Sequence, residues 1–136
     1  MCLKTLGLLF TVLSTNILLS QTPTPRASGH LFYFKPTNSL LLFDGYEPGT
    51  RTSSGRSEIW QWVSQQWKKI DSNDQPLRSL SGAAYMSEAD QIFIYGGIGS
   101  HGYDDSLRDA YTYNGRQWKK IDDVSIGTHD HHEIAY

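Results

Sequence analysis

The densest group of metal-ligating side chains is the run His129-Asp130-His131-His132-Glu133. On an extended segment His129 and His131 point to the same side, and two imidazole nitrogens at that spacing can bind Zn²⁺ or Cu²⁺. No third ligand on that side is evident from the sequence. We therefore expect no bound metal or other cofactor, and name His129 and His131 as the candidate ligands if a metal binds.

Six further side chains that could bind a ligand lie in two stretches rich in Gly and Ser, residues 46–57 and 98–107. They can donate or accept hydrogen bonds, stack or pair with charge, and they are Arg51, Arg56, His101, Tyr103, Asp104 and Asp105. Binding residues concentrate in loops held by a rigid scaffold, although a solvated loop without any partner has the same composition. Asp104-Asp105-Ser106 could offer oxygens to Ca²⁺, but it lacks the alternating spacing of a dedicated calcium loop. The six are predicted as binding residues only.

The sequence contains no recognisable catalytic constellation. It has no Gly-x-Ser-x-Gly, phosphate-binding loop or His-Glu-x-x-His, and no pair of carboxylates stands out for acid–base chemistry. The formal net charge is -2, and acidic and basic residues alternate along the chain instead of forming a basic stripe. We therefore predict no catalytic residues and no nucleic-acid partner.

The N-terminal segment has the pattern of a secretory signal peptide. Lys4 gives a basic start, an apolar run extends to Leu19, and the small residue Ser20 precedes the expected cleavage point. A membrane anchor is the alternative, but the run is short and interrupted by polar residues, whereas a spanning helix needs about 20 apolar residues. We predict a signal peptide at 1–20, no membrane span in the mature chain, and an exported protein that is periplasmic, cell-surface or secreted. Cleavage would also remove Cys2, the only cysteine.

An internal repeat organises the rest of the chain. Trp67-Lys68-Lys69-Ile70 recurs 51 residues later as Trp118-Lys119-Lys120-Ile121. The run from Leu40 to Gly45 matches the run from Ile92 to Gly97 at an offset of 52 residues. Tandem units of about 50 residues are typical of repeat architectures such as propellers.

Each unit has the pattern of four β-strands. The two apolar runs just described are typical of central strands, and Asn114-Gly115 predicts a hairpin turn. No segment after the signal peptide has a helical period. His132 to Tyr136 resembles Ser81 to Tyr85, so a third unit is expected to begin near the end of the chain. In the first unit the strands are expected at residues 29–34, 39–44, 58–62 and 66–71.

The order of three motifs resembles a known repeat family. Gly96-Gly97 follows an apolar strand, Tyr113 lies sixteen residues later, and Trp118 closes the hairpin. This order is similar to that of kelch-repeat β-propellers, in particular the bacterial, galactose-oxidase-like class. Two departures are visible: Asp44-Gly45 replaces the diglycine in the first unit, and Ser81 stands where the family often has His.

The resemblance implies an all-β, incomplete propeller of two four-stranded antiparallel blades and the first strand of a third. An extended linker at 21–28 would precede blades at 29–78 and 79–128, with the third beginning at 129–136. Gly45 and Gly97 would let the chain bend where a side chain would collide with the next blade. Trp67 and Trp118 would fill the wedge between sheets.

The resemblance further implies a non-catalytic module that binds a protein or a glycan through the loops between strands and between blades. A carbohydrate-active enzyme, epimerase-, mutarotase- or oxidase-like, and a structural cell-surface protein are the alternatives. The oxidase needs a tyrosine linked to a cysteine, which a mature chain without cysteine cannot form. Because two blades leave strand edges and aromatic faces exposed, further blades from additional sequence or self-association are expected.

Overall fold

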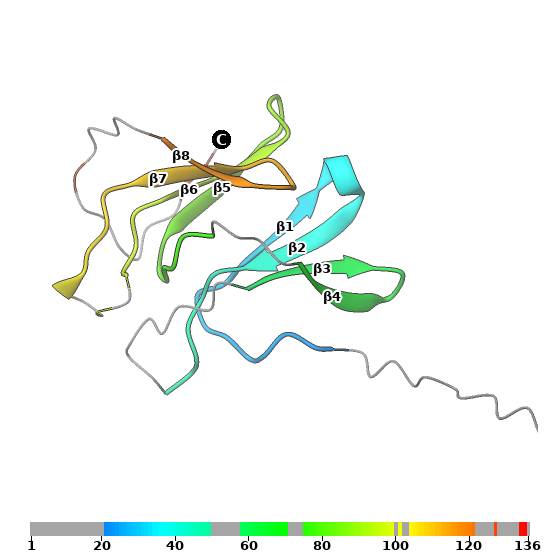
Figure 1. Ribbon diagram of the computed structural model, residues 1–136, viewed down its shortest axis with the longest axis horizontal. Helices are drawn as coiled ribbons and strands as arrows, with labels where there is room; N and C mark the ends of the chain where they lie inside the picture. The colour runs from blue at the N-terminus through cyan, green and yellow to red at the C-terminus, as the bar shows by residue number, and fades with distance from the viewer. Residues whose placement is uncertain are drawn as a thin grey trace, which may run out of the picture.

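The computed structural model describes residues 21–49, 58–70, 75–99, 101, 104–121, 127 and 134–135. These residues form two four-stranded antiparallel sheets and almost no helix, which confirms the predicted all-β class (Figure 1). Sheet 1 contains β1 (His30–Phe34), β2 (Ser39–Phe43), β3 (Ile59–Val63) and β4 (Gln66–Ile70), with the 3-10 turn η1 (Lys35–Thr37) after β1. Sheet 2 contains β5 (Gly82–Met86), β6 (Gln91–Tyr95), β7 (Ala110–Tyr113) and β8 (Trp118–Ile121).

The two sheets have the same strand order and the same register. Each strand pairs with its neighbours in sequence, giving β1-β2-β3-β4 in one sheet and β5-β6-β7-β8 in the other. Tyr33 pairs with Leu40 in sheet 1, and their repeat equivalents Tyr85 and Ile92 pair in sheet 2. The strands begin and end within one residue of the predicted bounds. The sequence repeat is therefore a structural repeat.

The predicted hairpin at Asn114-Gly115 joins β7 to β8. Gly115 has a φ of +90°, a value that L side chains rarely adopt. The Asn114 side-chain oxygen accepts hydrogen bonds from the backbone N–H groups of Arg116 and Gln117, both at 3.0 Å. These bonds hold the turn from inside and bring β8 back beside β7.

Each sheet has two faces, because side chains alternate along a strand and residues paired in register share a face. The A face of sheet 1 carries Leu31, Tyr33, Leu40, Leu42, Trp60, Trp62 and Trp67. The B face of sheet 1 carries Phe32, Phe34, Leu41, Phe43, Ile59 and Ile70. The A face of sheet 2 carries the repeat equivalents Ala83, Tyr85, Ile92, Ile94, Tyr111, Tyr113 and Trp118.

The core forms where the A face of sheet 2 packs on the B face of sheet 1. Phe34 contacts Tyr85 edge-on at 5.9 Å between ring centroids, and Phe43 contacts Trp118 at 5.7 Å. The buried residues of this core are Phe34, Leu41, Phe43, Ile59, Ile92, Ile94, Tyr113 and Trp118. Trp118 thus lies between the sheets as predicted, whereas its counterpart Trp67 lies on the A face of sheet 1, away from sheet 2.

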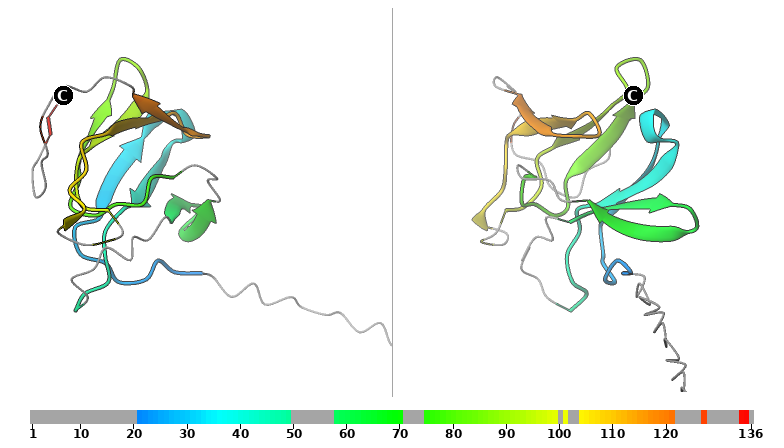
Figure 2. Two further views of the ribbon diagram at one scale, coloured as in Figure 1. Left: turned by 60° about the vertical axis from the view of Figure 1, so that its left-hand side comes forward. Right: turned by 45° about the vertical axis from the view of Figure 1, so that its right-hand side comes forward.

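The sheets approach each other at their first strands. Backbone contacts between the sheets are concentrated between β1 and β5. The fourth strands, β4 and β8, lie on opposite sides of the molecule, so the two sheets diverge from β1 and β5 outward (Figure 2).

The glycines at the ends of β2 and β6 are required by a close approach within their own sheet, not by the neighbouring sheet as expected. A Cβ on Gly97 would lie 2.5 Å from the carbonyl oxygen of Ser79, and one on Gly45 would lie 2.7 Å from that of Ala27. Both carbonyls belong to the segment that enters the first strand of the same sheet. Both glycines also have a φ near +90°, 89° and 97° respectively.

The first and last predicted segments of the chain lie largely outside the described residues. The predicted signal peptide, 1–20, lies outside the described residues. So does most of the predicted third unit at 129–136, of which only Ile134 and Ala135 are described, and neither is in a strand. Within the described ranges, no helix has the length and apolar composition needed to span a bilayer.

Candidate functional site

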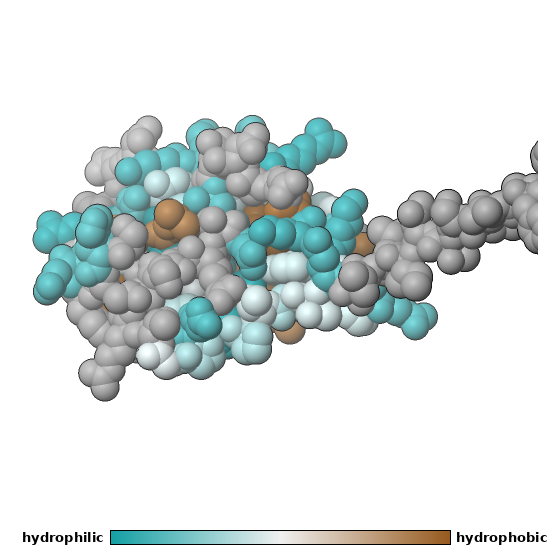
Figure 3. Space-filling view, turned by 60° about the horizontal axis from the view of Figure 1, so that its bottom comes forward, coloured by the Kyte–Doolittle hydropathy of each residue, from teal (hydrophilic) through white to brown (hydrophobic). Residues whose placement is uncertain are grey.

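Charged side chains gather at one end of the two sheets. Because neighbouring strands are antiparallel, β2 and β4 end where β1 begins, so the β2–β3 and β4–β5 connections start at that end of sheet 1. In sheet 2 the β6–β7 connection and the segment after β8 start at the corresponding end. We call this the loop end; it is the end at which the sequence placed the candidate binding residues. Figure 3, which views Figure 1 from below, shows mainly hydrophilic residues with scattered apolar ones.

In sheet 2 a buried arginine ties three elements together at the loop end. Arg78 donates to the carbonyl oxygen of Gly96 at 2.8 Å and to Oδ1 of Asp109 at 2.8 Å, and its guanidinium lies 4.9 Å from the Tyr111 ring centroid. Lys120 Nζ lies 3.5 Å from Oδ2 of the same aspartate. Burial alone would raise the pKa of Asp109, but Arg78 and Lys120 bring it below its ordinary value. The carboxylate is therefore kept ionised by fixed cations.

The same network recurs in sheet 1. Arg26 donates to the carbonyl oxygen of Asp44 at 3.1 Å and to Oε2 of Glu58 at 3.5 Å, and Lys69 donates to Oε1 of Glu58 at 2.8 Å. Burial would raise the pKa of Glu58, but hydrogen bonds from Lys69 and Trp60 bring it below its ordinary value. Since the network occurs once in each sheet, it stabilises the repeat unit.

A second polar cluster joins the two sheets and was not predicted. Ser81, just before β5, donates from its hydroxyl to Oδ2 of Asp44 at 2.5 Å, and Asp44 follows β2. His30, at the start of β1, donates from Nε2 to the carbonyl oxygen of Ser81 at 3.0 Å. The imidazole nitrogen lies 3.7 Å from the Asp44 carboxylate. Three side chains thus connect sheet 1 to sheet 2 through hydrogen bonds at the loop end.

This cluster has the residue types of a serine hydrolase triad but not its geometry. In a triad the imidazole accepts the serine proton while its other nitrogen donates to the carboxylate. Here the Ser81 hydroxyl donates directly to Asp44, and the same His30 nitrogen faces both partners. Ser81 is also buried. The arrangement therefore crosslinks the sheets and does not activate a nucleophile.

Burial controls the protonation of both ionisable members of this cluster. It raises the pKa of Asp44 to about 6, although hydrogen bonds from Ser81 and Gly45 and the charges of nearby arginines oppose the shift. Burial also lowers the pKa of His30 from its ordinary value, opposed by the hydrogen bond to the Ser81 carbonyl. Near neutral pH the cluster consequently holds a carboxylate and an uncharged imidazole.

The structure brings two of the six predicted binding residues together. His101 Nδ1 lies 3.2 Å from Oδ2 of Asp105, and the imidazole is highly exposed. The backbone of Asp105 accepts a hydrogen bond from Gly99 N–H at 2.9 Å, so this pair is fixed to the β6–β7 connection. Asp104 is exposed beside them. The remaining predicted residues, Arg51, Arg56, Tyr103, His129 and His131, lie outside the described residues.

Metal-ligating side chains do not converge within the described part of the chain. No group of three or more His, Cys, Asp or Glu residues there has the arrangement needed to hold an ion. The candidate ligands His129 and His131 are outside that part, and the pair of His101 and Asp105 has no third metal-ligating side chain beside it among the described residues.

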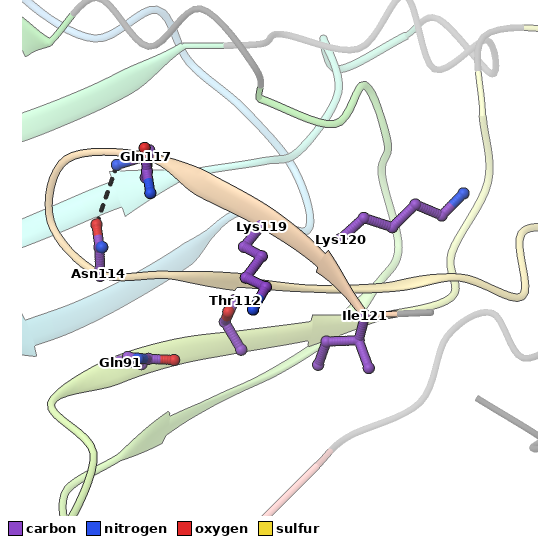
Figure 4. Close-up of a pocket in the computed structure, with 7 residues that line it drawn as sticks. All are labelled: Gln91, Thr112, Asn114, Gln117, Lys119, Lys120 and Ile121. Carbon is purple, nitrogen blue, oxygen red and sulfur yellow. Dashed lines mark hydrogen bonds between the residues drawn. The ribbon is translucent and has the colours of Figure 1, made fainter. Parts of the chain in front are cut away.

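A cavity of about 360 Å³ lies along β7 and β8 on the B face of sheet 2, between the Asn114 turn and Ile121 at the end of β8 (Figure 4). Thr112 of β7 and Lys119 of β8 are paired in register and lie side by side in its wall. Sequence reasoning missed it, although Thr112 and Lys119 occupy the alternate, polar positions of their strands. The lining residues are Gln91, Thr112, Asn114, Gln117, Lys119, Lys120 and Ile121.

No protein-family model matches the chain, and no curated protein matches its sequence. The functional conclusion therefore rests on the residues and their arrangement.

Proposed function

We propose that the chain forms kelch-type β-propeller blades and acts as an exported, non-catalytic module that binds a protein or a glycan at its loop end. The observation that carries the proposal is the structural repeat. Two sheets with one strand order and one register pack A face on B face and diverge from their first strands. Propeller blades are four-stranded sheets arranged radially around a central channel, with their first strands innermost.

The ligand site of this proposal is the loop end, because the scaffold beneath it is fixed. The Arg78 and Arg26 networks and the cluster of His30, Asp44 and Ser81 attach the strand ends to one another. His101 and Asp105 project from this scaffold as a hydrogen-bonding pair. Loops held in this way lose little conformational entropy on binding, which favours recognition.

A catalytic role is less well supported than binding. The one described set of Ser, His and Asp is engaged in crosslinking the sheets, as its hydrogen-bond directions indicate. A structural cell-surface role would need the same scaffold but no ligand at the loop end. The proposals are therefore separated by whether a ligand binds there.

The test is a glycan-array and affinity-purification screen of the purified chain, followed by two matched variants. His101→Ala removes an exposed imidazole at the loop end, and Arg116→Ala removes an exposed side chain in the β7–β8 turn at the opposite end. We expect a ligand whose binding weakens with His101→Ala and is unchanged with Arg116→Ala. Absence of any glycan or protein ligand, or turnover of a sugar by the purified chain, would contradict the proposal.

A further inference from the structure

The cavity in the B face of sheet 2 is lined by polar side chains that the protein itself leaves without a partner. The described lining residues come from β6, from β7 and β8 and from the turn between these two strands (Figure 4). Within the described part of the chain, the side chains of Gln91, Thr112 and Lys119 make no hydrogen bond or ion pair. Their hydrogen-bonding groups are therefore available to a ligand.

The same positions in sheet 1 are satisfied within the protein. Ser39 and Gln61 occupy the register positions in sheet 1 that Gln91 and Thr112 occupy in sheet 2. Gln61 Nε2 donates to Ser39 Oγ at 2.9 Å, and the Ser39 hydroxyl also lies 2.7 Å from the Thr37 hydroxyl. Ser39 is buried. The repeat thus closes this site with internal hydrogen bonds in sheet 1 and leaves it open in sheet 2.

The cavity has the size for a small molecule, because the chain itself already covers another part of this face. Tyr95 and Ala110, on the B face next to the loop end, are 3% and 0% exposed. The Tyr95 hydroxyl donates to the carbonyl oxygen of Gly127. The cavity extends over the polar part of the face, from the Asn114 turn to Ile121. Its volume of about 360 Å³ lies at the lower end of the range of about 300–1,000 Å³ found for small-molecule pockets.

The groups that line the cavity favour a ligand that is negatively charged and rich in acceptors. Lys119 carries an ammonium group, and the described lining residues include no acidic side chain. Lys120 also lines the cavity, but its Nζ lies 3.5 Å from Oδ2 of Asp109, which balances its charge. The Asn114 side-chain oxygen already accepts two backbone N–H groups of the turn, which leaves its NH₂ group as a donor. Lys119 is therefore the charge in this cavity that a ligand can neutralise.

A sugar ring that carries a carboxylate matches this set of groups. Lys119 can pair with the carboxylate, and charge-assisted hydrogen bonds of this kind are about twice as strong as neutral ones. The Thr112 hydroxyl and the amides of Gln91 and Gln117 can both donate and accept, as the hydroxyl groups of a sugar require. Ile121 supplies an apolar contact for the C–H groups of the ring. A simple carboxylate would use only the first of these contacts.

We propose that this cavity binds an acidic sugar, with Lys119 holding the carboxylate and Thr112 and Gln91 holding hydroxyl groups. The site is formed by other residues than the His101 and Asp105 pair of the loop end, so it does not depend on a ligand there. It adds a second binding site to the proposed function and names the class of sugar that this site recognises.

The experiment is a titration of the isotope-labelled full chain with glucuronate, glucose and acetate, each to about 10 mM, followed by the NMR shifts of the backbone amides. Glucose has the ring without the carboxylate, and acetate has the carboxylate without the ring. Lys119→Gln removes the ammonium group and keeps a hydrogen-bonding side chain. Lys68→Gln is the matched control, because Lys68 is the repeat equivalent of Lys119 in sheet 1 and is also exposed. Circular dichroism of both variants checks that the sheets are retained.

The expected result is saturable binding of glucuronate, with the largest shifts at Thr112, Lys119 and their neighbours. Glucose and acetate should each bind about tenfold more weakly or worse, since each makes only part of the contacts. Lys119→Gln should weaken glucuronate binding about tenfold, and Lys68→Gln should leave it unchanged.

Three results would overturn the proposal. The first is no binding of glucuronate, or binding no tighter than that of glucose or acetate. The second is an equal loss in Lys119→Gln and Lys68→Gln, because a general positive field and not this cavity would then hold the ligand. The third is a set of shifts confined to the surroundings of His101, which would place the sugar at the loop end and leave the proposed function intact.

Discussion

Replacing Gly97 by alanine tests whether the close approach at the end of β6 is essential to the repeat unit. Gly97 has a φ of +89°, and its Cβ would lie 2.5 Å from the Ser79 carbonyl oxygen and 2.9 Å from the Ser81 nitrogen. Gly49→Ala is the matched control, because Gly49 has a φ of +91° with nothing within 4 Å of the Cβ position. The two variants share the backbone strain and differ in the collision.

The expected loss in unfolding free energy is the sum of the backbone strain and the cost of the collision. An L residue in the left-handed region costs about 1–2 kcal/mol, which is the whole expected loss for Gly49→Ala. In Gly97→Ala the Ser79 segment must also move, which breaks its two backbone hydrogen bonds with Ile98, of 3.0 Å and 2.8 Å. Each is worth about 1 kcal/mol, so the total loss in unfolding free energy is about 3–4 kcal/mol.

Urea unfolding followed by tryptophan fluorescence measures both losses, because the buried Trp118 and Trp60 become exposed to water on unfolding. Gly45→Ala should repeat the larger loss in sheet 1, since its Cβ would lie 2.7 Å from the Ala27 carbonyl oxygen. Equal losses for Gly97→Ala and Gly49→Ala would refute the reasoning, because the collision would then contribute nothing.

Three further changes test the core and the cluster between the sheets. Burial raises the pKa of Asp44 from 3.8 to about 6. The folded protein therefore binds this proton more tightly than the unfolded chain, which stabilises the fold fully below pH 3.8, and this stabilisation is lost as the pH rises through about 6. Relative to Asp44→Asn, the unmodified chain should lose about 3 kcal/mol of unfolding free energy between about pH 4 and about pH 8, and a constant difference in urea titrations would contradict this. Trp118→Ala should cost about 3–5 kcal/mol, measured by circular dichroism melting, because the ring fills the space between the sheets; a loss below 1 kcal/mol would argue against that packing. The Tyr113 hydroxyl is buried and has no hydrogen-bond partner among the described residues, so Tyr113→Phe should leave stability unchanged or raise it by about 1 kcal/mol, and a marked loss would reveal a missed partner.

The local elements were predictable because their signals are local. Alternating aromatic residues, continuous apolar runs and the Asn114-Gly115 turn each act over a few residues, and the strands begin and end close to where these patterns placed them. The repeat offset predicted that both units would have the same strands, and they do. The candidate binding residues were harder, because a loop's composition does not say which of its side chains meet. Of the six, three are described, and among these the structure shows a contact between His101 and Asp105.

What the sequence by itself determined is the all-β class, the strands and the unit that is repeated. Even the departures from the family's pattern, Asp44 and Ser81, were visible in it, but only as isolated differences. The tertiary structure decided that these two residues meet, with His30, and that one A face is buried in the core while its equivalent in sheet 1 keeps exposed side chains, Leu31 and Tyr33. The physical reason is that hydrogen bonds along a strand pair follow from neighbouring residues, whereas the packing of one sheet on another depends on side chains far apart in the chain.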